Sequence, residues 1–165
     1  MAELQKPVVS RADVELQPAT GRGNFASHIA RVGPLLGLTK LGCALQVVPP
    51  GKKAFPHHLH HMADEMMVIL EGRGTYRWGD ERFPIQAGDM IGAPMASRAH
   101  QIENDGEEDL VYLTFSNNAE ADVVEYPDSG KVAYRAGMSG GDRASGSIRA
   151  VGRMTETDYW DGETT

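Results

Sequence analysis

The sequence predicts an all-β protein made of short antiparallel strands. Short apolar runs are separated by turn residues every eight to twelve positions, and no long amphipathic helix interrupts them between residues 41 and 115. Strands of this kind protect their edges by folding into a sandwich or barrel. A length of 165 residues suits one domain with a core of its own.

About eight strands are expected in this region, and turn signals end them. Gly79-Asp80 and Asp105-Gly106 are dipeptides that favour tight hairpins. Pro49-Pro50-Gly51 and Ala87-Gly88-Asp89 end other apolar runs. The expected strands are 41–48, 55–60, 65–70, 75–78, 82–85, 90–93, 99–104 and 109–115.

The segments on either side of this barrel read as irregular extensions. Residues 1–40 form an N-terminal extension in which Phe25 to Val32 could add a strand or a short helix. Residues 41–116 form the barrel, and residues 117–165 form a C-terminal extension that packs on the barrel or on a partner subunit. Tyr159-Trp160 is its last apolar anchor, a clasp or a lid, and the span 137–146 is a loose polar loop.

Composition excludes several classes of protein. The net charge is −7 and no basic stripe appears, so neither nucleic acid nor an anionic membrane is an expected partner. The first ten residues lack the apolar run of a signal peptide, and no stretch reaches the roughly 20 apolar residues of a membrane span. Cys43 is the only cysteine and alternates with Leu41, Leu45 and Val47, which indicates a buried core thiol. The protein is expected to be cytoplasmic.

The residues that carry chemistry are His58, His60, Glu65 and His100. On a strand, residues two apart face the same side, so the imidazoles of His58 and His60 stand together with Cα atoms roughly 7 Å apart. Glu65 lies an odd number of residues beyond His60 and needs a turn to join them. With such a turn, the four side chains can close around one divalent metal ion.

Two other interpretations of the same residues are open. His57, His61 and Glu65 are four apart and would be neighbours on a helix. The helical zinc-protease motif, however, places its glutamate directly after the first histidine, and that position here is His58. In the second alternative the histidines are surface residues of a turn, which explains poorly why four occur within five residues.

The motifs around these residues resemble the two cupin signatures. Gly51-x6-His58-x-His60-x4-Glu65-x6-Gly72 resembles the first, and Gly88-x5-Pro94-x-Ala96-x3-His100-x3-Asn104 resembles the second. One additional residue precedes each histidine element, and Ala96 stands where a glycine is usual. The resemblance covers residues 41–116. It implies a double-stranded β-helix, a small jelly-roll barrel, and a homodimer formed through its outer strands.

The ligand set suits one divalent transition metal, namely Mn, Fe, Ni, Zn or Cu. The favoured function is an enzyme acting on a small oxygen-rich anionic substrate, because similar stand-alone cupins suggest sugar-phosphate isomerisation. A metal-dependent dioxygenase or decarboxylase of a small acid is the first alternative, and a non-catalytic small-molecule binding module is the second.

Other residues are expected near the mouth of the pocket. Arg98, two residues before His100, is placed to bind an anionic substrate, with an exposed solvated arginine as the alternative. By strand alternation the apolar wall comprises Met67, Ile69 and Ile102, with Asn104 on the same face. Lys52 and Lys53 could form a cationic rim or a solvated turn, and Tyr76 and Tyr112 are core aromatics or proton donors.

Overall fold

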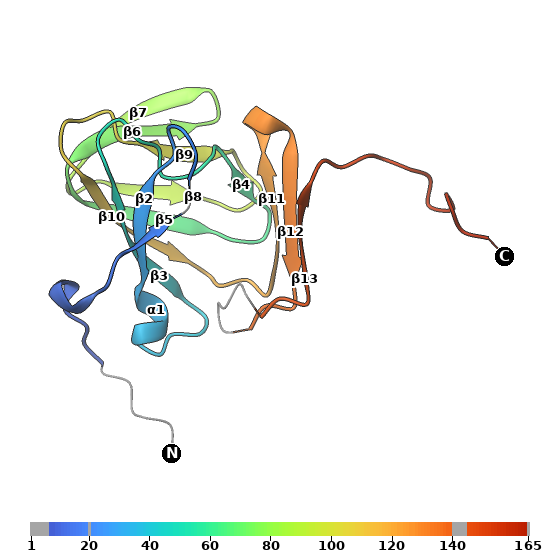
Figure 1. The fold of residues 1–165 in the computed structure, drawn as a ribbon, viewed down its shortest axis with the longest axis horizontal. Helices are drawn as coiled ribbons and strands as arrows, with labels where there is room; N and C mark the ends of the chain where they lie inside the picture. The colour runs from blue at the N-terminus through green and yellow to red at the C-terminus, as the bar shows by residue number, and fades with distance from the viewer. Residues whose placement is uncertain (1–6, 20, 140–144, 165) are drawn as a thin grey trace, which may run out of the picture.

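The computed structural model describes residues 7–19, 21–139 and 145–164, which fold almost entirely as β-strands (Figure 1). The strands are β1 (Gln17–Ala19), β2 (Ser27–Arg31), β3 (Gly42–Val48), β4 (Leu59–His60), β5 (Glu65–Glu71), β6 (Arg73–Trp78), β7 (Glu81–Gln86), β8 (Met90–Ala93), β9 (His100–Glu103), β10 (Leu110–Ser116), β11 (Ala121–Tyr126), β12 (Lys131–Ala136) and β13 (Ile148–Gly152). Within these residues the only α-helix is α1 (Val32–Leu35), and none could span a membrane.

The strands form three antiparallel sheets. One has the order β1-β2-β3-β10-β5-β8, the second β7-β6-β9, and the third β13-β12-β11-β4. The first two enclose a core in which Val48, Ile69 and Leu110 are almost fully buried. The third sheet stands beside the barrel and joins it through β4 (Figure 1).

The predicted all-β class is confirmed, and the strands expected between residues 41 and 115 are present with small shifts at their ends. The exception is 55–60, where only Leu59–His60 is a strand. Pro56 has no N–H to donate, and the residues before β4 contact their neighbours only through isolated bridges such as His58 to His100. The helical interpretation of His57, His61 and Glu65 is wrong, because these residues lie in bends and at the start of β5.

The two extensions are more regular than the sequence indicated. The N-terminal extension adds β1 and β2 to the edge of the largest sheet, and the C-terminal extension forms β11, β12 and β13. The turn from Tyr126 to Gly130 closes a hairpin whose strands pair over six residues, with Gly130 in the left-handed region at φ 61°.

Ion pairs and hydrogen bonds hold the tip of this hairpin against the barrel. Arg77 of β6 donates to both carboxylate oxygens of Asp128, at 2.7 and 3.0 Å. The buried imidazole of His57 lies 3.4 Å from the same carboxylate. Close to the same tip, His61 Nε2 is 2.7 Å from Glu125 Oε1. The hairpin is therefore held against the strands that carry the predicted metal ligands.

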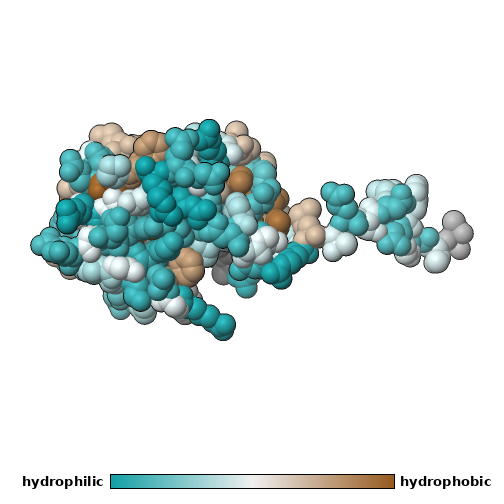
Figure 2. Space-filling view, turned by 90° about the horizontal axis from the view of Figure 1, so that it is seen from above, coloured by the Kyte–Doolittle hydropathy of each residue, from teal (hydrophilic) through white to brown (hydrophobic). Residues whose placement is uncertain are grey.

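The end of the chain leaves the body of the molecule. Tyr159 and Trp160 are 83% and 70% exposed, and their segment projects away from the sheets (Figures 1 and 2). They do not clasp the barrel of their own chain, because both side chains are exposed and the hydrogen bonds of this segment are local, such as Asp161 N–H to Asp158 O. Packing on a partner subunit, and the homodimer itself, stay predictions. Part of the predicted 137–146 loop lies outside the described residues.

Asn104 organises the turn between β9 and β10. Its amide group donates to the carbonyl oxygens of Val48 at 2.7 Å and Glu108 at 2.8 Å, and its Oδ1 accepts from Gly106 N–H at 3.0 Å. The side chain is 2% exposed, and its bond to Val48 O is buried, so water does not readily replace that bond if the amide is removed. Its role is structural, and it lies on the barrel side that the alternation predicted.

Replacing Asn104 with Ala is therefore expected to lower the free energy of unfolding by about 3 kcal/mol, since it leaves the buried Val48 carbonyl and two part-buried backbone groups without this partner. Urea denaturation followed by circular dichroism measures the change. Asn117→Ala is the matched control, because that amide makes an exposed 3.4 Å contact with Met62 O. Equal midpoints for both variants would contradict the structural role of Asn104.

Candidate functional site

The segments that carry His58 and His100 are joined by main-chain hydrogen bonds. His58 N–H donates to His100 O at 3.1 Å, and His100 N–H donates to His58 O at 2.7 Å. This reciprocal antiparallel pair places the two imidazoles on one side of the ladder, with ring centroids 4.5 Å apart. His60 lies two residues beyond His58 on the same face, with its ring centroid 5.0 Å from that of His58.

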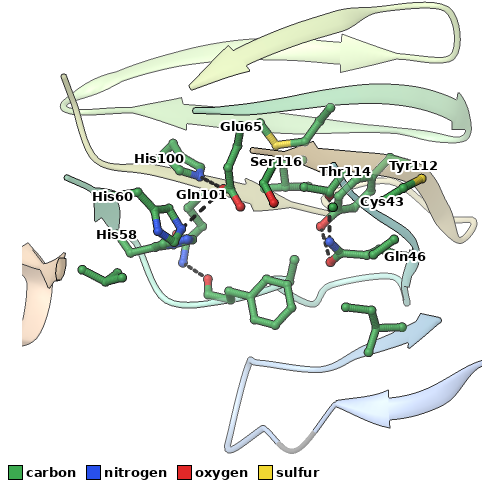
Figure 3. Close-up of a pocket in the computed structure, with 18 of the residues that line it drawn as sticks. Cys43, Gln46, His58, His60, Glu65, His100, Gln101, Tyr112, Thr114 and Ser116 are labelled. Carbon is green, nitrogen blue, oxygen red and sulfur yellow. Dashed lines mark hydrogen bonds and ion pairs between the residues drawn. The ribbon is translucent and has the colours of Figure 1, made fainter. Parts of the chain in front are cut away.

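Glu65 reaches these rings from the first residue of β5. The bend between β4 and β5 is held by Asp64, whose carboxylate accepts from Met95 N–H at 2.8 Å. Glu65 Oε2 lies 3.1 Å from His100 Nε2 and 3.6 Å from His60 Nε2 (Figure 3). The ligand atoms of His58, Glu65 and His100 lie within 4.8 Å of one another, so these three residues could hold a metal ion.

Burial sets the ionisation of the site. Burial, together with the neighbouring imidazoles of His100 and His60, lowers the pKa of His58 to about 3. Burial acts to raise the pKa of Glu65, but the hydrogen bond from His100 and the adjacent imidazoles outweigh it and hold that pKa at about 2. At neutral pH His58 is therefore neutral and Glu65 is a carboxylate, which are the forms that bind metal ions.

Hydrogen bonds on the outer side of two imidazoles orient them. His58 Nδ1 donates to Pro56 O at 2.8 Å, and His60 Nδ1 donates to Asp122 Oδ2 at 2.6 Å. In both rings Nε2 is left as the free nitrogen, as is usual for metal-binding histidines with a carbonyl or carboxylate partner. Burial opposes the low pKa of Asp122, but the His60 hydrogen bond leads the effects that lower it, so this partner is an anion.

Asp122 was not among the residues predicted from the sequence. Its signal was present, since Asp122, Val124 and Tyr126 alternate on one face of a strand. The structure places all three against the site: Val124 and Tyr126 line the pocket, and the Tyr126 ring lies 6.1 Å from that of His58 at an angle of 26°. The sequence could not tell that β11 pairs with β4, which brings this face to the site.

The His58, His60, Glu65 and His100 side chains lie at one end of a pocket of about 240 Å³. Three polar side chains at the end of the pocket away from the histidines form a hydrogen-bonded row. Tyr112 OH donates to Gln46 Oε1 at 2.9 Å, and Gln46 Nε2 donates to Thr114 Oγ1 at 2.7 Å (Figure 3). Burial raises the pKa of Tyr112, so its phenol is protonated at neutral pH. The pocket suits a small, oxygen-rich molecule better than a drug-sized one.

Several residues expected near the pocket lie elsewhere. Met67 and Ile102 line it, whereas Ile69 is buried in the core and Tyr76 OH donates to Gly92 O at 3.2 Å. Cys43 is half-buried and lines the pocket, so its prediction as a core residue is wrong. Along β3 the core residue Val48 belongs to the other set of alternating positions. Burial raises the pKa of the Cys43 thiol, consistent with an unreactive side chain.

The cationic side chains predicted at the mouth are engaged outside the pocket. Arg98 does not line it: this half-exposed side chain donates to Glu81 Oε1 at 2.5 Å on the surface. Lys53 pairs with Glu103 at 3.0 Å, and Lys52 donates to Gly23 O at 3.2 Å. A role for Arg98 in substrate binding stays a prediction that this geometry does not support.

The donor set fits a bound metal ion. Imidazole and carboxylate ligands converge from β5, β9 and the β4 region, and outer hydrogen bonds fix two of the rings. Ala96, in the turn before β9, has φ 53°, a conformation that favours glycine, and its N–H donates to His60 O at 2.7 Å. The turn thus keeps the backbone shape that the glycine of the resembled motif would give.

Comparison with known proteins agrees with this geometry. Residues 44–116 match the cupin domain family. Auxin-binding protein 1 of Arabidopsis thaliana is 30% identical over 132 residues, which cover 74% of this chain and 65% of that protein. The chain spans less than two thirds of the length of the curated relatives that it matches.

Solved structures agree as well. A protein from Acidithiobacillus ferrooxidans, provisionally assigned as a sugar phosphate isomerase, superposes with a TM-score of 0.74 at 29% identity, covering 83% of this chain and 92% of that one. A Thermotoga maritima protein, assigned by prediction as an oxalate decarboxylase, gives a TM-score of 0.58 at 26% identity, covering 67% of this chain and 97% of that one. The histidine and glutamate motifs, the β fold and these similarities together identify residues 44–116 as a cupin domain.

Proposed function

We propose that this cupin is a metal-dependent enzyme that acts on a small, oxygen-rich, anionic substrate, with isomerisation of a sugar phosphate as the favoured reaction. The observation that carries the proposal is the convergence of His58, Glu65 and His100 at one end of a small pocket. The similarity to the Acidithiobacillus ferrooxidans protein, which extends over most of both chains, supports the choice of reaction.

His60 is the proposed fourth ligand. Its Nε2 lies 3.6 Å from Glu65 Oε2, and its Nδ1 is already occupied by Asp122, so only Nε2 is available to an ion. Three imidazoles and one carboxylate suit Mn, Fe, Ni, Zn or Cu. A divalent ion held there would supply Lewis acidity to an oxygen atom of the substrate.

The remaining polar groups of the pocket position the substrate. The Tyr112, Gln46 and Thr114 row offers hydroxyl and amide groups to substrate hydroxyls, and the protonated phenol of Tyr112 can donate but not remove a proton at neutral pH. Met67 and Ile102 form apolar walls that exclude water from the ligand set. Glu65, with its low pKa, serves as an anionic ligand rather than as a proton donor.

The second candidate is a decarboxylase or dioxygenase of a small acid. The pocket of about 240 Å³ accommodates a dicarboxylate as readily as a short sugar phosphate, and the Thermotoga maritima protein is similar over nearly its whole length. A non-catalytic binding module would use the same pocket without turnover.

The ligand set is tested by replacing His60 with Ala. The variant is expected to lose stoichiometric metal, measured by plasma mass spectrometry after growth in defined metals, because an imidazole ligand is removed while the barrel core is untouched. His61→Ala is the matched control, since that ring is bonded to Glu125 and does not line the pocket. Full metal content in His60→Ala would count against His60 as a ligand.

Asp122→Asn tests the outer hydrogen bond. The amide can still accept from His60 but removes the negative charge, so metal affinity is expected to fall about 10–100-fold, the usual range for an outer partner of a ligand. Competition with a chromogenic chelator measures the change. Asp128→Asn is the control, because that carboxylate holds the same hairpin but bonds Arg77. An equal effect of both variants would mean that Asp122 acts only through hairpin docking.

The reaction is tested with metal-loaded protein and a panel of aldose and ketose phosphates, oxalate and other small acids. Aldose–ketose interconversion, followed by NMR, is the expected outcome. Carbon dioxide release or oxygen uptake with a small acid would favour the second candidate. Binding of the panel without any turnover would favour the binding module.

A further inference from the structure

Two arginines line the pocket, and neither is the one that the sequence pointed to. Arg31 comes from the end of β2 and Arg135 from β12, whereas Glu65 is the only carboxylate among the lining residues. With a divalent ion in the site, the pocket wall would carry an excess of positive charge. Such a wall attracts an anion and repels a cation.

Arg135 is fixed beside the proposed metal ligands. It faces Asp122 across the β11–β12 ladder, and its Nη2 donates to Asp122 Oδ2 at 3.3 Å. That same oxygen accepts from His60 Nδ1, so the carboxylate is shared between the imidazole and the guanidinium. The guanidinium therefore lies one carboxylate away from His60.

The Nε–H group of Arg135 is buried and has no hydrogen-bond partner among the described residues. A buried donor without an acceptor is costly, and native proteins nearly always satisfy such groups with protein, water or ligand. Because Arg135 lines the pocket, an oxygen atom of a bound ligand can supply the acceptor. A guanidinium presents its donors in a planar fork that matches phosphate and carboxylate.

Arg31 is exposed, and its side chain makes no hydrogen bond or ion pair with any described residue, although its main chain pairs in the β2–β3 ladder. Other cationic side chains near the barrel are paired with carboxylates, as Arg98 is with Glu81 and Lys53 with Glu103. An unpaired arginine at the pocket lining remains available to a ligand that enters from solvent.

We propose that Arg135 binds the anionic group of the substrate, a phosphate or carboxylate, and that Arg31 assists its capture. This assignment rests on the proposed function, since it places the anionic group beside the metal ligands. It also makes the C-terminal hairpin part of the site: Asp122 orients His60, and Arg135 binds the substrate.

Calorimetric titration of inorganic phosphate and of oxalate into the metal-loaded full chain tests the proposal. Arg135→Gln is expected to weaken phosphate binding about tenfold or more, the scale of a charge-assisted hydrogen bond, with metal content unchanged. Arg135→Lys keeps the charge but loses the fork, so it is expected to restore only part of the affinity. Arg31→Gln is expected to have a smaller effect that fades with added salt. A stronger response to phosphate than to oxalate would indicate a phosphate ester as substrate.

Arg98→Gln is the matched control, as an arginine paired with a carboxylate outside the pocket, and is expected to bind phosphate like wild type. Equal phosphate affinity in wild type and Arg135→Gln would overturn the assignment, as would metal-loaded wild type that binds neither anion. A loss of metal in Arg135→Gln matching that in Asp122→Asn would also overturn it, because the arginine would then act through His60. Wild type that takes up no metal would instead refute the proposed function.

Discussion

The reciprocal main-chain pair between His58 and His100 is the constraint on which the site depends. Two segments about forty residues apart in the sequence exchange N–H to O bonds at the ligand residues themselves. Backbone pairing fixes the separation of two side chains more firmly than any contact between the rings. Glu65 then needs only to enter from the adjacent β5, with the bend at Asp64 held by Met95 N–H, to complete a compact set of ligand atoms.

A second constraint, the His60–Asp122 hydrogen bond, joins the barrel to the C-terminal sheet. Asp122 accepts from His60, Arg135 and the Met62 N–H, so one carboxylate connects β4, β11 and β12. The Arg77 bridge to Asp128 holds the other end of the same hairpin. The C-terminal hairpin is thus fixed at two points around the site, which is the geometry needed if it contributes to ligand binding.

Burial and the neighbouring imidazoles both lower the pKa of His58, whereas burial and electrostatics oppose each other at Glu65 and electrostatics prevails. Burial keeps His58 neutral, and the surrounding imidazoles keep Glu65 ionised, although each group is largely withdrawn from water. Burying such polar groups is unfavourable, so they are rare in structural cores and are concentrated at binding and active sites. The same reasoning applies to the unpartnered Nε of Arg135.

The sequence by itself determined the barrel and the residues that meet in it. Strand alternation put His58 and His60 on one face, the turn dipeptides placed the hairpins, and the motif spacing identified Glu65 and His100. Strand alternation and turn dipeptides are local properties, set by neighbouring residues and by a period of two, whereas His100 was identified by the spacing of the second resembled motif. Only the tertiary structure decided the outer half of the site: that β11 pairs with β4, that Asp122 reaches His60, and that Arg135 rather than Arg98 lines the pocket. Those contacts join segments some sixty residues apart, as the His60–Asp122 bond does, and no local pattern encodes which strand edge a distant hairpin will meet.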